Sequence, residues 1–287
     1  MPLKRIIARL DIKGPNLVKG INLEGLRVLG NPDFFFKDYY NAGADEIIYH
    51  DCVASLYDKK FILQLINKAS SNIFIPVAVG GGIKTLKDIE LNLKNGADKV
   101  FINSAAIKNP KFLNEAVKNF GSSTISISIE ANKKSDNKYY CFYDYGRETS
   151  TWQARDWVEE VQSRGVGEII LTSILKEGTG EGFDIELLNL VYDKISVPFI
   201  FHGGAGTINH LHQVLKLKKI SGVAISSILH YSLIRSAKFK FENKKEGNTS
   251  YILSKNKIFS NKFENTSIDK LKKKLKKDLP DIRLWKK

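Results

Sequence analysis

The feature that most constrains the fold is an internal repetition with a nearly constant spacing. GADEIIYHD at 43–51 is similar to GVGEIILTS at 165–173, an offset of 122 residues. VGGGI at 79–83 is similar to HGGAG at 202–206, an offset of 123, and LDI at 10–12 to IEA at 129–131, an offset of 119. Three pairs in the same order predict two equivalent halves related by an approximate two-fold axis.

Short β-branched segments alternate with longer amphipathic ones along the chain, which favours βαβ units and a parallel sheet. Eight strands and their helices in about 230 residues predict one closed (βα)₈ TIM barrel, an α/β fold. A doubly wound open sheet is the alternative. The expected strands are 5–10, 46–50, 73–79, 99–103, 124–129, 168–171, 198–202 and 222–225, and expected helices include 59–69, 86–94, 110–119, 151–163 and 185–191.

The C-terminal segment differs from the rest in charge and composition. Of the net charge of +14, +10 comes from residues 236–287, where 16 lysines and arginines face 6 acidic residues. We interpret 238–263 as an inserted loop before the last helix, which follows an N-cap at Ser267, and residues 1–287 as a single barrel domain. Because the body of the chain is not strongly basic, we expect no nucleic-acid partner.

The composition also indicates the cellular compartment of the protein and whether it binds a membrane or a metal. The two cysteines, Cys52 and Cys141, have no metal-ligand spacing and favour a reducing compartment. Neither a signal peptide nor an apolar run of membrane-spanning length is apparent, so we expect a cytoplasmic protein without a membrane partner. The histidines show no ligand spacing, so we expect no metal and no cofactor.

Two glycine-rich turns each follow a predicted strand, at equivalent places in the two halves. Glycine lets backbone N–H groups approach an anion closely, and a helix N-terminus favours negative charge. Plain tight turns are the alternative, but two cradles at one barrel mouth predict a ligand with a phosphate at each end. The candidate phosphate-binding residues are Gly81, Gly82, Asn103 and Ser104 in one half and Gly203, Gly204, Ser226 and Ser227 in the other.

Asp11 and Glu130 end the first and fifth predicted strands and should face each other between the cradles. Carboxyl groups on either side of a substrate suit general acid and base roles. The alternative is that each is a strand-end carboxylate held by Lys13, Lys19 or the backbone.

Four charged residues stand at the opposite ends of the strands. Because buried charges need partners, they predict either a structural ring of ion pairs or a gate on the barrel axis. These residues are Arg5, Glu46, Lys99 and Glu168.

Taken together, these residues resemble the cyclase (HisF-type) subunit of imidazole glycerol phosphate synthase. The likeness covers about residues 1–231 and resumes at 267–284. It is carried by KRIIARLDIK at 4–13, LVKG at 17–20, AGADE at 42–46, VGGGI at 79–83, GADKV at 96–100, GEIILTS at 167–173 and GGAG at 203–206.

The resemblance implies that a glutaminase partner docks at the N-terminal face of the barrel and that its ammonia travels up the barrel axis. The ammonia would convert a bisphosphorylated aminoimidazole carboxamide ribonucleotide into imidazole glycerol phosphate and an aminoimidazole carboxamide ribonucleotide. The resemblance also implies that Asp11 and Glu130 are the acid/base residues and that Gly178 belongs to the second phosphate site. The four charged residues at the opposite ends of the strands would form the ammonia gate.

Several residues depart from the family pattern. Glu130 replaces an aspartate, and a displacement of about 1 Å in a catalytic group can cost about a hundred-fold in rate. Arg9 and His202 replace small residues, and Glu177 replaces an aspartate. If the Arg9 side chain reaches the carboxyl groups of the site, its positive charge should favour their ionised form. Glu130, Arg9 and the inserted loop leave open the alternative of a HisF-like paralogue that delivers ammonia to a sugar amidotransferase in the synthesis of amidino sugars for surface polysaccharides. A third alternative is a non-catalytic ammonia conduit or assembly subunit whose basic C-terminal segment contacts a partner.

Overall fold

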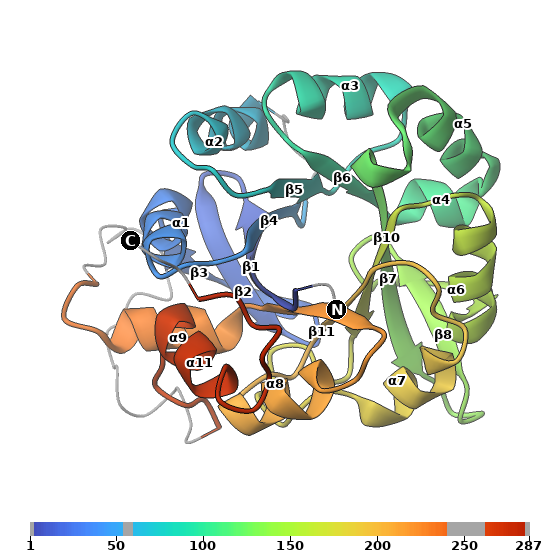
Figure 1. Cartoon of the computed structure of the whole chain (residues 1–287). Coiled ribbons are helices and arrows are strands. Elements are labelled where there is room, and N and C mark those ends of the chain that lie inside the picture. The colour runs from blue at the N-terminus through green and yellow to red at the C-terminus, as the bar shows by residue number, and fades with distance from the viewer. Residues whose placement is uncertain (1–2, 54–59, 240–261, 285–287) are drawn as a thin grey trace.

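The computed structural model describes residues 3–53, 60–239 and 262–284, and eight parallel strands form a closed ring within it (Figure 1). β1 pairs with β4 on one side and with β12 on the other, so the first and last strands of the ring are neighbours. This closure confirms the predicted barrel and excludes the open sheet. In ring order the strands are β1 (Arg5–Lys13), β4 (Glu46–Asp51), β5 (Val77–Gly80), β6 (Lys99–Ile102), β7 (Ile125–Lys133), β10 (Glu168–Ser173), β11 (Phe199–His202) and β12 (Ile220–Ile225).

Helices form an outer layer around the ring (Figure 1). The N-cap predicted at Ser267 is confirmed, since its side chain accepts a hydrogen bond from the Lys270 amide of α11. Across the described ranges, no helix combines the length and apolar character needed to cross a membrane. The helices are α1 (Pro32–Asn41), α2 (Lys60–Ser70), α3 (Leu86–Lys94), α4 (Ser104–Lys108), α5 (Lys111–Phe120), α6 (Ala154–Ser163), α7 (Ile185–Tyr192), α8 (Ile208–Leu215), α9 (Ser227–Arg235) and α11 (Ile268–Leu275), with a 3₁₀ turn at Ser122–Thr124.

The apolar core has two layers because successive side chains of a strand point to opposite faces. Ile6, Ala8 and Leu10 of β1 belong to the large cluster between strands and helices. Ile7 belongs to a smaller cluster inside the ring. The same alternation turns every second β1 side chain into the barrel, and it therefore places Arg5, Arg9 and Asp11 inside.

Two antiparallel hairpins extend the barrel wall, and the sequence did not predict them. β2 (Asn16–Ile21) and β3 (Glu24–Gly30) follow β1, while β8 (Tyr139–Tyr143) and β9 (Glu148–Gln153) follow β7. Each half of the barrel thus begins with a long strand that leads into a hairpin, which agrees with the internal repetition.

Some predicted boundaries move. The strand expected over 73–79 begins only at Val77, after Pro76, which has no N–H to donate to a ladder. The helix expected over 151–163 begins at Ala154 because 151–153 belong to β9. The inserted loop predicted at 238–263 lies almost entirely outside the described residues, and its reading as part of a single domain stays a prediction.

Candidate active site at the barrel mouth

The first predicted glycine turn lines a cavity at the C-terminal ends of β5, β6 and β7. Gly81 and Gly82, with φ of 100° and 64°, share this cavity with Asn103, Ser104 and Glu130. A Cβ atom on Gly81 would lie 2.2 Å from the Asp51 carbonyl oxygen, so only glycine fits there. Lys84 and Arg147 also line the cavity and supply the positive charge that a phosphate would require.

The second glycine turn lines a smaller cavity on the opposite side of the mouth. It unites every candidate of that half: Gly178, Gly203, Gly204, Ser226 and Ser227. The hydroxyl of Ser226 is already engaged, since it donates to the Arg9 carbonyl oxygen at 3.0 Å. The Ser227 hydroxyl at the start of α9 is buried without a protein partner. Ser227 is therefore the side chain of this pair that can meet a ligand.

Asp11 lies in a buried charge network rather than on the first cavity. Its carboxylate is fully buried and accepts from Arg9 Nε at 3.0 Å and from Lys19 Nζ at 3.1 Å. Lys19 also forms an ion pair with Glu177. The expected influence of Arg9 on a nearby carboxylate is thus confirmed, and Lys19 is the lysine that holds Asp11.

Arg9 crosses the inside of the barrel. Its Nη2 donates to His50 Nδ1 on β4 at 2.5 Å, and its Nη1 lies 3.4 Å from both Thr172 Oγ1 on β10 and His202 Nδ1 on β11. The side chain is 1% exposed. Arg9 therefore links β1 with β4, β10 and β11 in one layer just above the apolar cluster inside the ring.

The charges in this layer determine the protonation states of Asp11 and His50. Burial opposes the ionisation of Asp11, but the positive charges of Arg9 and Lys19 outweigh it and hold its pKa well below the usual range. Burial also lowers the pKa of His50 to about 4, helped by Arg9, so His50 accepts from the guanidinium as a neutral imidazole. Asp11 is thus a fixed anion near neutral pH.

Glu130 has the opposite character. It is 1% exposed, and its Oε2 accepts a hydrogen bond from the Gly146 amide at 2.9 Å. Burial raises its pKa to about 7, although Arg9 and the Gly146 N–H partly offset this effect. A carboxyl group that titrates near neutral pH beside a cavity is suited to proton transfer.

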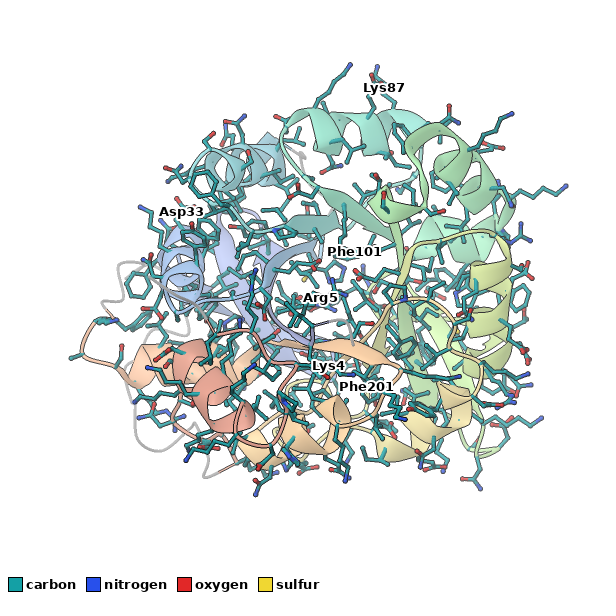
Figure 2. All side chains as sticks on the ribbon, in the orientation of Figure 1. Lys4, Arg5, Asp33, Lys87, Phe101 and Phe201 are labelled. Atoms are coloured by element: carbon teal, nitrogen blue, oxygen red, sulfur yellow. The ribbon has the colours of Figure 1, made fainter. Side chains whose placement is uncertain are left out.

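The four charged residues at the N-terminal ends of the strands meet as one ring. Arg5 pairs with Glu46 at 2.7 Å and with Glu168 at 2.5 Å, and Lys99 lies 3.2 Å from each of the two carboxylates. Burial raises the pKa of Glu46, while Lys99 and Arg5 oppose this rise. Figure 2 shows Arg5 within the ring of strands, with Lys87 at the outer surface.

His50 and Thr172 are the site residues that the sequence reasoning missed. The signal was the period of two along each strand, which places His50 on the same face as Glu46 and Thr172 on the same face as Glu168. His50 also lies with Asp11 and Cys52 in the one group of potential metal ligands found among the described residues. Arg9 and Lys19 occupy both oxygens of Asp11, and their charges oppose a cation there.

Comparison with known proteins shows the family to which this chain belongs. Residues 5–235 match the family model described as "Histidine biosynthesis protein". The chain belongs to that family. The matched range contains all the candidate site residues named above, whereas α11 lies beyond it.

Members of the histidine biosynthesis family give the likeness more detail. The chain is 47% identical to imidazole glycerol phosphate synthase subunit HisF of Legionella pneumophila over 208 residues, which cover 72% of this chain and 98% of the relative. It is 41% identical to the subunit of the same name from Hydrogenobaculum sp. (strain Y04AAS1), over 82% of this chain and 93% of the relative. With the Streptococcus sanguinis (strain SK36) subunit it shares 39% identity, over 83% of this chain and 94% of the relative.

Proposed function

We propose that this protein is the cyclase subunit of imidazole glycerol phosphate synthase. In this proposal it uses ammonia to convert a bisphosphorylated aminoimidazole carboxamide ribonucleotide into imidazole glycerol phosphate and an aminoimidazole carboxamide ribonucleotide. The observation that carries the proposal is the pair of glycine-lined cavities flanking a carboxyl group of pKa about 7, in a chain similar to HisF subunits along most of its length.

The two cavities would hold the two ends of the substrate. Backbone N–H groups at Gly81 and Gly82, with Lys84 and Arg147, would bind one phosphate. Those at Gly203 and Gly204, with Ser227, would bind the other, helped by the N-terminus of α9. The reacting part of the substrate would then lie between the cavities, beside Glu130.

The two carboxyl groups would have different roles. Glu130 would take a proton from ammonia as the nitrogen adds to an unsaturated carbon of the substrate and the electron pair of that carbon's π bond moves to its heteroatom. A pKa near 7 allows Glu130 both protonation states. Asp11 would remain ionised and stabilise positive charge that develops on the substrate.

Ammonia would come from a glutaminase subunit at the N-terminal face of the barrel. Three apolar side chains lie exposed near that face: Phe74 before β5 is 94% exposed, Leu3 before β1 is 53% exposed, and Leu284 follows Ile282, which bridges to Lys4. Exposed apolar side chains around an opening are typical of an interaction surface. The ring of Arg5, Glu46, Lys99 and Glu168 would be the gate that ammonia passes.

The test is turnover of the purified chain with saturating ammonium salt and the bisphosphate substrate, with formation of imidazole glycerol phosphate as the readout. Wild type should form the product, and Glu130→Gln should not. Absence of product with wild type, in a preparation shown to be folded by circular dichroism, would contradict the proposal. Because the relatives are named as synthase subunits, we do not propose the sugar-amidation or conduit role.

A further inference from the structure

Two large side chains, those of Arg9 and Phe101, extend into the barrel interior. Arg9 extends from β1 to Thr172 on β10 and to His50 on β4. Phe101 of β6 lies over β5, because a Cβ atom on Gly80 would be only 2.0 Å from its Cε2 atom, and its ring contacts that of His50 with centroids 5.4 Å apart. Figure 2 shows Phe101 inside the ring of strands. These contacts lie on β4, β5 and β10, and none of them is with β7.

The inner face of β7 carries small hydroxyl side chains at this level. Ser126 and Ser128 are each 1% exposed, and the hydroxyl of each is buried without a protein partner. A buried hydroxyl without a protein partner can form a hydrogen bond to a small polar molecule, and leaving it unsatisfied costs about 1–3 kcal/mol. Ser126 and Ser128 lie on the same face of β7, and their hydroxyl groups form a polar track through an otherwise apolar layer.

This track joins the charged ring to the first cavity. Ser126 is in register with Glu168 of the ring on β10 and with Phe101 on β6. Two residues further along β7, Ser128 lines the cavity, and Glu130 follows it there. The inner face of β7 therefore runs from the gate at one end of the barrel to the proton-transfer group at the other.

We propose that ammonia crosses the barrel along the inner face of β7, hydrogen-bonded in turn to the hydroxyls of Ser126 and Ser128, and reaches the substrate beside Glu130. This inference rests on the proposed function. Arg9 spans the interior from β10 and β11 to His50 on β4, so the proposed route lies on the β7 side of the barrel axis.

The test compares two ammonia sources in the complete complex with its glutaminase. Ammonia released from glutamine must cross the barrel, whereas ammonium salt in the medium reaches the cavity from the mouth. Ser126→Val fills the track below the cavity and removes a hydroxyl, and it should lower the ratio of glutamine-driven to ammonium-driven turnover by about tenfold or more, a change equivalent to about 1.4 kcal/mol of barrier. Ser126→Ala removes only the hydroxyl and should lower the ratio by less.

Ala224→Val is the matched control, because it also places a valine on the inner face of a strand, β12, but away from β7. Ala224 also lines the smaller cavity, so the readout is the ratio of the two ammonia sources, in which an effect on phosphate binding cancels. Its ratio should equal that of wild type. An unchanged ratio in both Ser126 variants, or an equal loss in Ala224→Val, would overturn the β7 route. Failure of the proposed function is distinguishable, since wild type would then give no product even with ammonium salt.

Discussion

Arg9 Nε donates to Asp11 Oδ1 at 3.0 Å, so a guanidinium and a carboxylate two residues apart on one strand form a buried ion pair inside the barrel. The pair takes part in the network with Lys19 and His50. It keeps Asp11 ionised and, at the same time, fills part of the barrel interior. One departure from the family pattern therefore affects both the electrostatics of the site and the space available within it.

Arg9→Met should lower the free energy of unfolding by about 3 kcal/mol at pH 7, because it leaves a buried carboxylate without its guanidinium partner. Urea denaturation measures this loss. Because folding lowers the pKa of Asp11, its ionisation stabilises the fold fully above the unfolded value of about 3.9, and the deficit should shrink as the pH falls below that value toward the lower pKa of the folded state.

Arg155→Met is the control for the Arg9 prediction, because it breaks an exposed ion pair of 2.7 Å with Asp193. Its cost should stay below about 1 kcal/mol. Equal losses in the two variants would show that the Arg9 network adds nothing beyond a surface pair.

The pH dependence of catalysis should reflect Glu130. If Glu130 accepts the proton of ammonia, kcat/KM with ammonia held constant as the free base should rise with pH and level off above an apparent pKa near 7. Glu130→Asp should retain this rise, whereas Glu130→Gln should lose it together with most of the activity. A profile that is flat from pH 6 to 8 in wild type would contradict the assignment.

Much of the fold could be predicted from the sequence, because repetition and β/α alternation are local patterns that survive without knowledge of contacts. The glycine turns and the charged ring were also predictable, since each residue stands at a strand end and a closed barrel brings strand ends together. Asp11 and Glu130 were expected to end their strands, but β1 continues to Lys13 and β7 to Lys133, where each strand leads into a hairpin.

The different pKa values of Asp11 and Glu130 could not be predicted. They depend on the burial of both groups and on the side-chain conformations that bring Arg9 and Lys19 to Asp11, and these follow from contacts between residues on different strands. The hairpin at 139–153 was missed for a different reason: β9 has no buried residue, so it lacks the apolar alternation by which strands are recognised.

The second glycine turn should tolerate no side chain. A Cβ atom on Gly204, whose φ is 99°, would lie 1.9 Å from the Gly182 carbonyl oxygen, so Gly204→Ala must displace the backbone that lines the smaller cavity. We expect the KM for the bisphosphate substrate to rise by about tenfold or more, a loss of about 1.4 kcal/mol in substrate binding. Steady-state kinetics with ammonium salt measures it.

Gly121→Ala separates steric overlap from backbone strain, because Gly121 also has a positive φ, of 82°, but no atom within 4 Å of an added Cβ. This control should lose some stability, of the order of 1–3 kcal/mol, and keep the wild-type KM. A KM increase of the same size in both variants would argue against a phosphate cradle at Gly204.

Glu130 should lower the stability of the protein at alkaline pH, in contrast to Asp11. Its pKa rises from 4.5 to about 7 on folding, so the folded state binds more protons than the unfolded state between these values and loses stability as the pH increases through them. Glu130→Gln should therefore be more stable than wild type by up to about 3 kcal/mol at pH 8, with the gap closing toward pH 4.5. Urea denaturation of both proteins between pH 4.5 and pH 8 measures this difference in stability. As a control, Glu115→Gln at an exposed position on α5 should change the free energy of unfolding by less than about 0.5 kcal/mol over the same pH range. If the gap between Glu130→Gln and wild type did not vary with pH, the carboxyl group would not be titrating in the folded protein as its burial requires.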